Sequence, residues 1–467
     1  QSGRRQRQMC IRDRPGVERV QLAGSARRRK ETIGDLDIVV GVKPENHEDV
    51  ANAILALQGI ADVKGAGDSK ISLILEASIF EDGFSVGHID ANVMEAIGGD
   101  DYEQLESAGT IDAQVRLVPP EMFAFTLAYF TGSKEHNIAM RQRAIDRGLR
   151  LNEFGLIPED KAGELKGIEA AQYSLSAMTE QEIYSHLDLQ WVPPELREDT
   201  GEIQSGSEQK LPQLLELDTI QGALHNHTVV SDGEATLEQM ADAAQALGWT
   251  WLGIADHSPT LKVANGAPAD RLLEQGQKIR KYNQNWQDEG VNFRLFHGVE
   301  SDILAGGKLD HPDEVLNELD YVVASVHAMT KWRGRDESEN TEELLKVLEH
   351  PATKVLGHPT GRILQGREGY EVDVHRLIDA MAEHIEEGRF KSIELNASPY
   401  RLDIDYRLCK YAKLMGVPVA ISPDAHSIRG LADIQYGVMT ARKGWLEQGD
   451  VINSMSADAL AQQLALQ

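Results

Sequence analysis

The sequence predicts an α/β protein of two or three domains, and three observations support this prediction. The chain has 467 residues, 41% of them hydrophobic, which is a globular composition at a length that exceeds one typical domain. From about residue 219 onward, short β-branched apolar runs alternate with helical periodicity, a pattern typical of barrel-like α/β domains with parallel strands. In the first half, the apolar run 36–42 predicts a buried strand, and the apolar spacing over 46–58 predicts an amphipathic helix.

The composition excludes some classes of protein. No stretch approaches the ~18 consecutive apolar residues that a membrane-spanning helix needs. The two cysteines, Cys10 and Cys409, are too few for a disulfide framework and favour a reducing cytosol. The formal net charge of -28 argues against non-specific coating of nucleic acid by the whole chain. It does not exclude a DNA enzyme, because local basic runs at 27–30 and 134–150 can contact phosphates.

Several further segments can be assigned from local patterns. Residues 1–14 (QSGRRQRQMCIRDR) are predicted to be non-native, because they have no initiator methionine, no apolar core of a signal peptide and no periodicity. Residues 121–149 predict helical pieces interrupted at Thr131-Gly132-Ser133, and the polar stretch 201–212 predicts an interdomain linker. Residues 236–247 predict an amphipathic helix that ends at Gly248.

Nearly every predicted strand of the second half ends in a residue type that binds metals. His225 and His227 are two residues apart, so on a strand both side chains leave the same face. In an α/β barrel the carboxyl ends of the strands meet at one mouth, so we expect such side chains to converge there. Mixed imidazole and carboxylate groups suit zinc, manganese or iron. The residues in question are His225, His227, Asp232, Asp256, His257, Glu300, His327, His358, Asp424 and His426.

The motifs that carry these residues are LHNHTVVSDG, IADH, GVES, VASVH, GHPTGR, ELNAS and SPDAH. Together they closely resemble the polymerase and histidinol phosphatase (PHP) domain, from about residue 219 to the C-terminus. The resemblance implies a distorted (β/α)7 barrel that holds two or three divalent ions, with Glu300 as a bridging ligand. It implies phosphoester hydrolysis by metal-activated water, with Arg362 and Arg401 as candidate phosphate clamps. The implied ligands are His225, His227, Asp232, His257, Glu300, His327, His358, Asp424 and His426.

The first half carries a second signature. In GSARRRKETIGDLDIVVG at 24–41, Asp35 and Asp37 alternate on a predicted strand, so both carboxylates can share Mg²⁺. This segment resembles nucleotidyltransferases of the polymerase-beta type, and YFTGSKEHNIAMR at 129–141 resembles family X DNA polymerases. The resemblance implies catalytic roles for Asp35 and Asp37. It further implies that the triphosphate is held by Gly24, Ser25 and Arg28, the deoxyribose by Tyr129, Phe130 and Gly132, the base by Asn137 and the template by Arg141.

The resemblance also predicts the domain boundaries. A palm at 15–118, with an atypical segment at 78–111, precedes a thumb at 119–190, a linker at 191–218 and the PHP domain at 219–467. The family's regions upstream of the palm are missing, so the reading frame is expected to be truncated at its N-terminus. The family's third catalytic carboxylate falls on Gln114, and Asp112, two residues earlier, would share its strand face.

The two resemblances together imply a bacterial family X DNA polymerase whose PHP domain trims DNA ends during base excision repair. The expected activity is a 3′-to-5′ exonuclease, with cleavage at abasic sites as a further possibility. The expected partners are gapped or primer-end DNA and dNTP, and the expected location is the bacterial cytosol, at the nucleoid. Three alternatives stay open: gap-filling polymerisation as the main activity, a small-molecule phosphatase of the histidinol-phosphatase type, and a non-catalytic DNA-end binding module.

Overall fold

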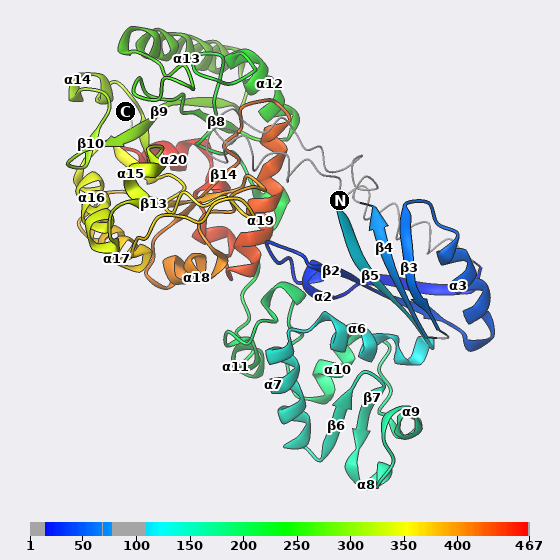
Figure 1. Ribbon diagram of the computed structural model, residues 1–467. Helices are drawn as coiled ribbons and strands as arrows, with labels where there is room; N and C mark the ends of the chain where they lie inside the picture. The colour runs from blue at the N-terminus through cyan, green and yellow to red at the C-terminus, as the bar shows by residue number, and fades with distance from the viewer. Residues whose placement is uncertain (1–14, 68, 77–108, 466–467) are drawn as a thin grey trace. The chain divides into compact units, whose positions relative to one another are not determined.

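The computed structural model describes residues 15–67, 69–76 and 109–465. The predictions for 1–14 and for most of the atypical segment 78–111 therefore lie outside the described residues. The described chain forms two compact units, of which the first ends at Leu211 and the second begins at Pro212. Figure 1 shows each unit with its own sheet.

The first unit contains a five-stranded sheet in the order β1-β2-β5-β4-β3. Strands β2 and β5 are parallel, and the other neighbouring pairs are antiparallel. Alternate residues of β2, Leu36, Ile38 and Val40, pack with Val50 and Ile54 of helix α3 on one face of the sheet. The predicted strand and amphipathic helix are thus confirmed. The elements are β1 (Val17–Leu22), α2 (Gly24–Arg27), β2 (Asp35–Val42), α3 (His47–Leu55), β3 (Ile60–Ala66), β4 (Lys70–Glu76) and β5 (Thr110–Val118).

The remainder of the first unit is mainly helical and follows β5. Two helices separated at Gly132 confirm the predicted interruption, and Ser133 begins the second by accepting a hydrogen bond from the His136 amide. A two-stranded ribbon and four short helices complete this part. The elements are α6 (Phe123–Thr131), α7 (Lys134–Ile145), β6 (Leu149–Asn152), β7 (Gly155–Pro158), α8 (Glu159–Ala162), α9 (Gly167–Ala170), α10 (Glu180–His186) and α11 (Glu202–Ser207).

The predicted linker at 191–218 is wrong for most of its length. Arg197 and Glu202 are fully buried in the first unit. Glu202 accepts hydrogen bonds from the amides of Asp199 and Thr200 and lies 2.6 Å from the Nδ1 atom of His136. The polar composition suggested exposure, but these side chains find buried partners of opposite charge or complementary hydrogen bonding. The change from one unit to the other comes only at Leu211 and Pro212.

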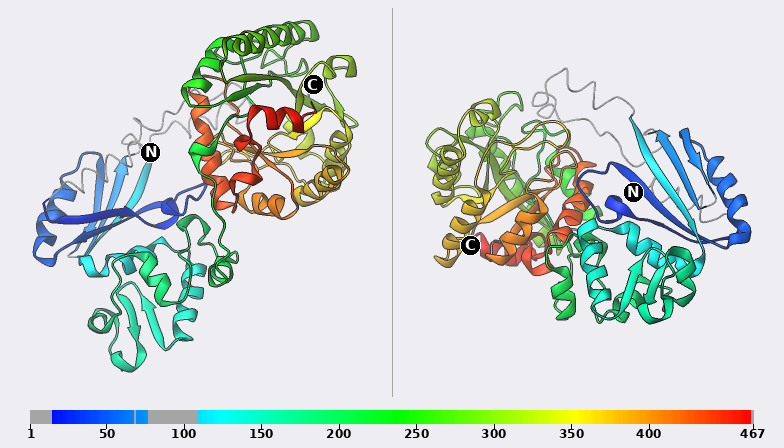
Figure 2. Two further views of the ribbon diagram at one scale, coloured as in Figure 1. Left: turned by 180° about the vertical axis from the view of Figure 1, so that it is seen from behind. Right: turned by 60° about the horizontal axis from the view of Figure 1, so that its bottom comes forward.

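The second unit is a curled sheet of mainly parallel strands with helices outside it, as the sequence predicts. The order is β10-β9-β11-β12-β13-β14. Strand β8 pairs in parallel with the first residues of β9, and the short strand β10 pairs antiparallel with its last residues. Figure 2 shows the helices arranged around the strands. The strands are β8 (Trp251–Ile254), β9 (Arg294–Leu304), β10 (Lys308–Leu309), β11 (Tyr321–Ser325), β12 (Thr353–Leu356), β13 (Ser392–Asn396) and β14 (Val419–Ser422).

The helices of this unit follow the strands in alternation. Helix α12 begins with a capping box at Thr236, and Gly248, with φ +83°, follows its last turn as predicted. The apolar faces of the helices pack on the outside of the sheet and form the largest core of the protein. The helices are α12 (Leu237–Ala246), α13 (Ala269–Glu289), α14 (Asp313–Leu316), α15 (Met329–Arg333), α16 (Glu337–Glu349), α17 (Val374–Glu386), α18 (Tyr406–Leu414), α19 (Ile434–Lys443) and α20 (Ala457–Gln463).

The segment 223–227 closes the barrel, although it is not the regular strand that the sequence predicts. It lies between β8 and the end of β14, where the Ala255 amide donates to the Asn226 carbonyl and the His227 amide donates to the Ala425 carbonyl. Its only ladder position among the described residues is the bridge between Asn226 and Ala425. The segment is therefore bonded on both sides, but at few points.

None of the described helices combines the length and apolarity that crossing a bilayer requires.

A buried ion network joins the two parts of the first unit. Glu180 of α10 accepts two hydrogen bonds from Arg27, at 2.9 and 2.6 Å, and one from Arg197, at 2.6 Å. Burial alone would raise the pKa of Glu180, but the charges of Arg197 and Arg27 lower it to about 2. Glu180 therefore stays ionised at all but strongly acidic pH and compensates the fully buried Arg197.

Replacing Glu180→Gln should destabilise the first unit by about 3–5 kcal/mol at pH 7, because Arg197 would keep a buried charge without its partner. The folded-state pKa lies below the ordinary value of 4.5, so the contribution is present above that value and is lost as the pH falls toward 2. Hydrogen exchange of the α6 and α10 amides in the full chain measures the loss at pH 7 and pH 3.

The matched control is Glu208→Gln, whose partner Lys210 is exposed, and it should change exchange little. Equal exchange in wild type and Glu180→Gln at pH 7 would contradict the assignment.

Candidate metal centre and nucleotide site

Glu300 lies at the centre of a group of imidazoles inside the barrel mouth. Its Oε2 atom is 3.2 Å from His225 Nε2, 2.8 Å from His257 Nδ1 and 3.7 Å from His227 Nε2. Its Oε1 atom is 3.3 Å from His327 Nε2 and 3.0 Å from His358 Nε2. The two carboxylate oxygens thus face two different sets of histidines, which is the arrangement a bridging carboxylate needs.

Two acidic side chains, Asp424 and Asp232, complete the group. Asp424 Oδ1 is 3.0 Å from His227 Nε2 and 3.6 Å from His225 Nε2. Asp232 lies 3.5 Å from His257 Nε2 and 3.4 Å from His426 Nε2. Three sets of ligand atoms within 4.8 Å of one another result: His227, Asp232, His257 and His426; His225, His227 and Asp424; and His257, Glu300 and His327.

The structure therefore brings all nine predicted side chains to one place, and their role as ligands stays a prediction. Several of their ring nitrogens are buried without a hydrogen-bond partner among the described residues, including His225 Nε2 and both nitrogens of His257, as is Glu300 Oε2. Buried polar atoms without partners are costly in a native structure. Divalent ions with imidazole and carboxylate ligands would satisfy them, so the residues fit a multinuclear metal centre.

The acidic groups of the cluster are held in the form that binds cations. Burial would raise the pKa of Glu300, but the nearby imidazoles of His225, His257 and His327 lower it well below its ordinary value. Burial acts in the same direction on Asp424, and His225, His227 and His426 again outweigh it. Both carboxylates are therefore ionised at neutral pH.

A second layer of polar residues orients these side chains, and the sequence prediction missed it. Glu394 is fully buried, lies 2.7 Å from His225 Nδ1 and accepts a 3.1 Å hydrogen bond from the His358 amide. Asn396 donates at 3.0 Å to both Glu394 and Asp424. The motif ELNAS contains both residues, but nothing in the sequence alone assigns them a partner.

Two aspartates also support the centre, one by contacting an imidazole and the other by holding a loop. Asp302 lies 2.9 Å from His327 Nδ1. Asp256, noted in the sequence as a ligand type at a strand end, instead accepts hydrogen bonds from the amides and hydroxyls of Thr228 and Ser231 and from Gln275. Asp256 thereby fixes the loop that leads to Asp232. Hydrogen-bonded carboxylates of this kind set the orientation of metal-binding imidazoles.

The two predicted phosphate clamps differ in their surroundings. Arg362 donates to the carbonyls of Arg401 and Leu402 and lies 3.7 Å from Asp405, so its guanidinium holds a neighbouring loop together. Arg401 has only 8% of its side chain exposed and makes no side-chain hydrogen bond or ion pair within the described residues. Of the two, Arg401 has the guanidinium available for an anion.

In the first unit, Asp35 and Asp37 lie on the sheet face opposite the core. The parallel register of β2 and β5 places Asp35 beside Asp112 and Asp37 beside Gln114. Asp112 is 52% exposed and is paired with Lys64 at 2.7 Å. Burial and the charge of Asp35 raise the pKa of Asp37. Among the described residues of this unit, no third metal-binding side chain comes within 4.8 Å of ligand atoms of both aspartates.

The Gly24-Ser25 turn lies directly against Asp37. A Cβ atom at Gly24, whose φ is +61°, would stand 2.5 Å from the Asp37 carboxylate, so only glycine fits there. Arg28, predicted to hold the triphosphate, here bonds to Glu198 at 3.0 Å and to the Thr131 carbonyl at 2.5 Å. Its guanidinium also lies against Gly132. Gly24 therefore lies beside Asp37 and the Arg28 charge acts on the same carboxylate, while the role of these residues in holding a triphosphate stays a prediction.

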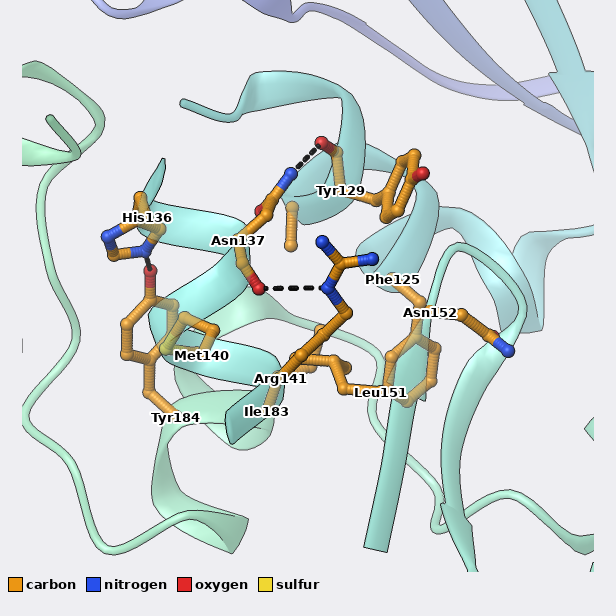
Figure 3. Close-up of a pocket in the computed structure, with 11 residues that line it drawn as sticks. Phe125, Tyr129, His136, Asn137, Met140, Arg141, Leu151, Asn152, Ile183 and Tyr184 are labelled. Carbon is orange, nitrogen blue, oxygen red and sulfur yellow. Dashed lines mark hydrogen bonds between the residues drawn. The ribbon is translucent and has the colours of Figure 1, made fainter. Parts of the chain in front are cut away.

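The predicted sugar, base and template residues surround the first turns of α7. Figure 3 shows a pocket lined by Tyr129, Asn137 and Arg141 together with the buried pair His136 and Tyr184. Asn137 donates to the Tyr129 carbonyl at 2.7 Å, and Arg141 donates to the Asn137 carbonyl at 3.2 Å. Phe130 does not line this pocket; the Arg116 guanidinium stacks 3.7 Å from its ring centre.

Substituting Glu394→Gln should weaken metal binding by about 10–100-fold, because His225 loses its carboxylate partner while the fold keeps a side chain of equal size. Elemental analysis after dialysis against a graded chelator measures the loss. The matched control, Glu383→Gln on the outer helix α17, should retain wild-type metal content. Unchanged metal retention in Glu394→Gln would refute this positioning role.

Comparisons with known proteins agree with this architecture. A family model described as DNA polymerase beta thumb matches residues 126–198, and a PHP domain model matches residues 223–398. The DNA polymerase/3'-5' exonuclease PolX of Bacillus subtilis is 37% identical over 434 residues, which cover 93% of this chain and 66% of that relative. This chain therefore spans slightly less than two thirds of the length of that protein.

Other relatives match the second unit alone. A probable phosphatase of Caldanaerobacter subterraneus is 31% identical over 211 residues, or 43% of this chain and 74% of its own length. A probable phosphatase of Acetivibrio thermocellus is 31% identical over 209 residues, or 43% of this chain and 78% of its own length. With the thumb and PHP matches in this order and the long alignment to PolX, the chain belongs to the family X DNA polymerases that carry a PHP domain.

Proposed function

We propose that the second unit hydrolyses phosphodiester bonds at the 3′ ends of DNA, with two or three divalent ions of Mn, Zn or Fe. The observation that carries this proposal is the convergence of nine imidazole and carboxylate side chains around the buried Glu300. The Bacillus subtilis relative is named a DNA polymerase and 3'-5' exonuclease, which supports DNA as the substrate class. Gapped or primer-end duplexes are the proposed partners, in the bacterial cytosol.

The residues divide the work of such a reaction. When bound, divalent ions lower the pKa of a coordinated water and neutralise charge on the phosphoryl oxygens. His225, His227 and Asp424 would hold one position, and His257, Glu300 and His327 a second. Glu394 and Asp302 keep the Nε2 atoms of His225 and His327 directed at the centre.

The test is incubation of the purified full chain with Mn²⁺ and a labelled DNA strand with a free 3′ end. Wild-type protein should shorten the strand one nucleotide at a time, and a chelator should stop the reaction. The double variant His225→Ala, His227→Ala should lose more than 100-fold in rate while still binding DNA, because it lacks ligands of the centre. The control His375→Ala alters an exposed histidine of α17 and should keep full activity.

Absence of shortening by wild-type protein with confirmed metal content would reject the proposal. So would wild-type rates in the double variant.

We propose a second, weak activity of this chain: the incorporation of dNTP with Mg²⁺ held by Asp35 and Asp37. Two-metal phosphoryl transfer needs carboxylates that hold both ions and accept the 3′-hydroxyl proton. The register places Gln114, which can do neither, beside Asp37. Asp112 lies two pairs further along, beside Asp35, and is bound to Lys64. Gly24, Ser25 and Arg28 would hold the triphosphate, and Tyr129, Phe130, Gly132, Asn137 and Arg141 the nucleoside and template.

Replacing Gln114→Asp should therefore raise dNTP incorporation on a gapped duplex by at least about 10-fold, because it supplies a third carboxylate beside Asp37. Primer extension measures the gain. The control Asp112→Asn should change incorporation little. Loss of wild-type incorporation in Asp112→Asn, with no gain in Gln114→Asp, would instead assign the third carboxylate to Asp112.

A small-molecule phosphatase is the competing proposal, because the probable phosphatases align with the second unit alone. The same protein preparation distinguishes the two. Faster hydrolysis of a free phosphomonoester, such as histidinol phosphate, than of a DNA 3′ end would favour the phosphatase.

A further inference from the structure

The rim of the barrel mouth has an apolar half. Three exposed aliphatic residues stand on the loops that follow the segment 223–227, β8 and β14: Val229 at 51%, Val263 at 52% and Ile428 at 48% exposure. These loops are neighbours, since Asn265 donates to the Ser231 carbonyl and the Glu234 amide donates to the His426 carbonyl. Each residue lies two to six positions after a predicted ligand of the metal centre.

The other half of the rim is cationic. Arg333, Arg367 and Arg401 stand on the loops that follow β11, β12 and β13, which are adjacent strands. The three loops pack together: the Leu364 amide donates to the Tyr400 carbonyl at 2.7 Å, and the Trp332 and Tyr370 rings lie 5.2 Å apart. Arg367 donates to the Gly361 carbonyl at 3.0 Å, which fixes its side chain within this group.

The three guanidinium groups are close enough to repel one another. Burial, together with the charges of Arg401 and Arg333, lowers the pKa of Arg367 to about 10. Arg401, which is 92% buried, has no carboxylate partner within the described residues. A guanidinium without a carboxylate partner is available to an anion, and guanidinium groups bind phosphate oxygens through paired hydrogen bonds.

We propose that Arg333, Arg367 and Arg401 bind backbone phosphates of the retained DNA strand next to the scissile phosphate, while Val229, Val263 and Ile428 contact the unpaired terminal base. The proposal rests on the proposed exonuclease function and specifies its substrate as a single-stranded 3′ end of several nucleotides. In the reaction, the oxygen of water joins the phosphorus and the bond from phosphorus to the 3′ oxygen breaks. A proton passes to that oxygen, which leaves a shortened strand and a nucleoside 5′-monophosphate.

Two substrates separate the arginine contacts from the chemistry. A ten-nucleotide single strand offers neighbouring phosphates, whereas thymidine 5′-p-nitrophenyl phosphate offers the scissile phosphate alone. Arg401→Ala should lower kcat/KM for the strand at least about 10-fold and change it less than about 3-fold for the small ester. The salt dependence for the strand should become shallower by roughly 0.7 in the log–log slope for each lost phosphate contact.

Arg333→Ala, at an exposed position that tolerates substitution, should act in the same direction. The matched control is Arg389→Ala, whose partners are exposed glutamates at the other end of β13, and it should leave both substrates unchanged. Equal loss on both substrates in Arg401→Ala and Arg333→Ala, or no loss on the strand, overturns the proposal.

The apolar half has its own test. Wild-type protein should release a terminal nucleotide that carries a base faster than a terminal abasic nucleotide, and Ile428→Ser should reduce that preference. An unchanged preference in Ile428→Ser overturns the base contact. Failure of wild-type protein to hydrolyse either substrate refutes the exonuclease itself. In that case fluorescence anisotropy of a labelled ten-nucleotide strand still tests the arginines, because Arg401→Ala and Arg333→Ala should weaken its binding and Arg389→Ala should not.

Discussion

The structure of the second unit depends on the burial of one carboxylate, Glu300, among five histidines. A charge in such a place would be strongly destabilising if its surroundings did not compensate it. Four parts of the barrel contribute to that compensation, since the surrounding imidazoles come from the segment 223–227 and from the ends of β8, β11 and β12. The barrel is therefore organised around an electrostatic requirement as much as around its apolar core.

The polar residues around the predicted metal ligands show how the need to compensate buried charge is met by the sequence. Glu394 and Asn396 on β13 hold His225, His358 and Asp424 at once, and Asp256 holds the loop to Asp232. These residues come from strands that supply no predicted ligand or only one. The first unit uses the same principle, because Glu180 joins Arg27 to Arg197 across its two parts. In both units, buried charges fix elements that are far apart in the chain.

Much of this could be read from the sequence, and the exceptions have physical causes. The nine side chains could be grouped because strand ends of a parallel barrel meet at one mouth, and the break at Gly132 follows from local chemistry. The segment 201–212 was misjudged because polarity suggested exposure, whereas Glu202 is satisfied by His136. The roles of Glu394 and Asp256 depend on partners as far as 169 and 28 residues away in the chain, which no local pattern reveals. Whether Gln114 faces Asp37 depended on strand register, which only the structure supplies.

The contact between the segment 223–227 and the end of β14, which closes the barrel, has a consequence for the synthesis of the protein. The segment 223–227 is the first part of the barrel wall to be synthesised. The strand β14, to whose end it is bonded, is the last strand to be synthesised. His225 and His227 therefore wait for nearly the whole unit to be synthesised before Asp424 and His426 arrive beside them. Until then the metal-binding sites of the nascent chain are incomplete. An ion that binds once both segments are present would link the two ends of the unit.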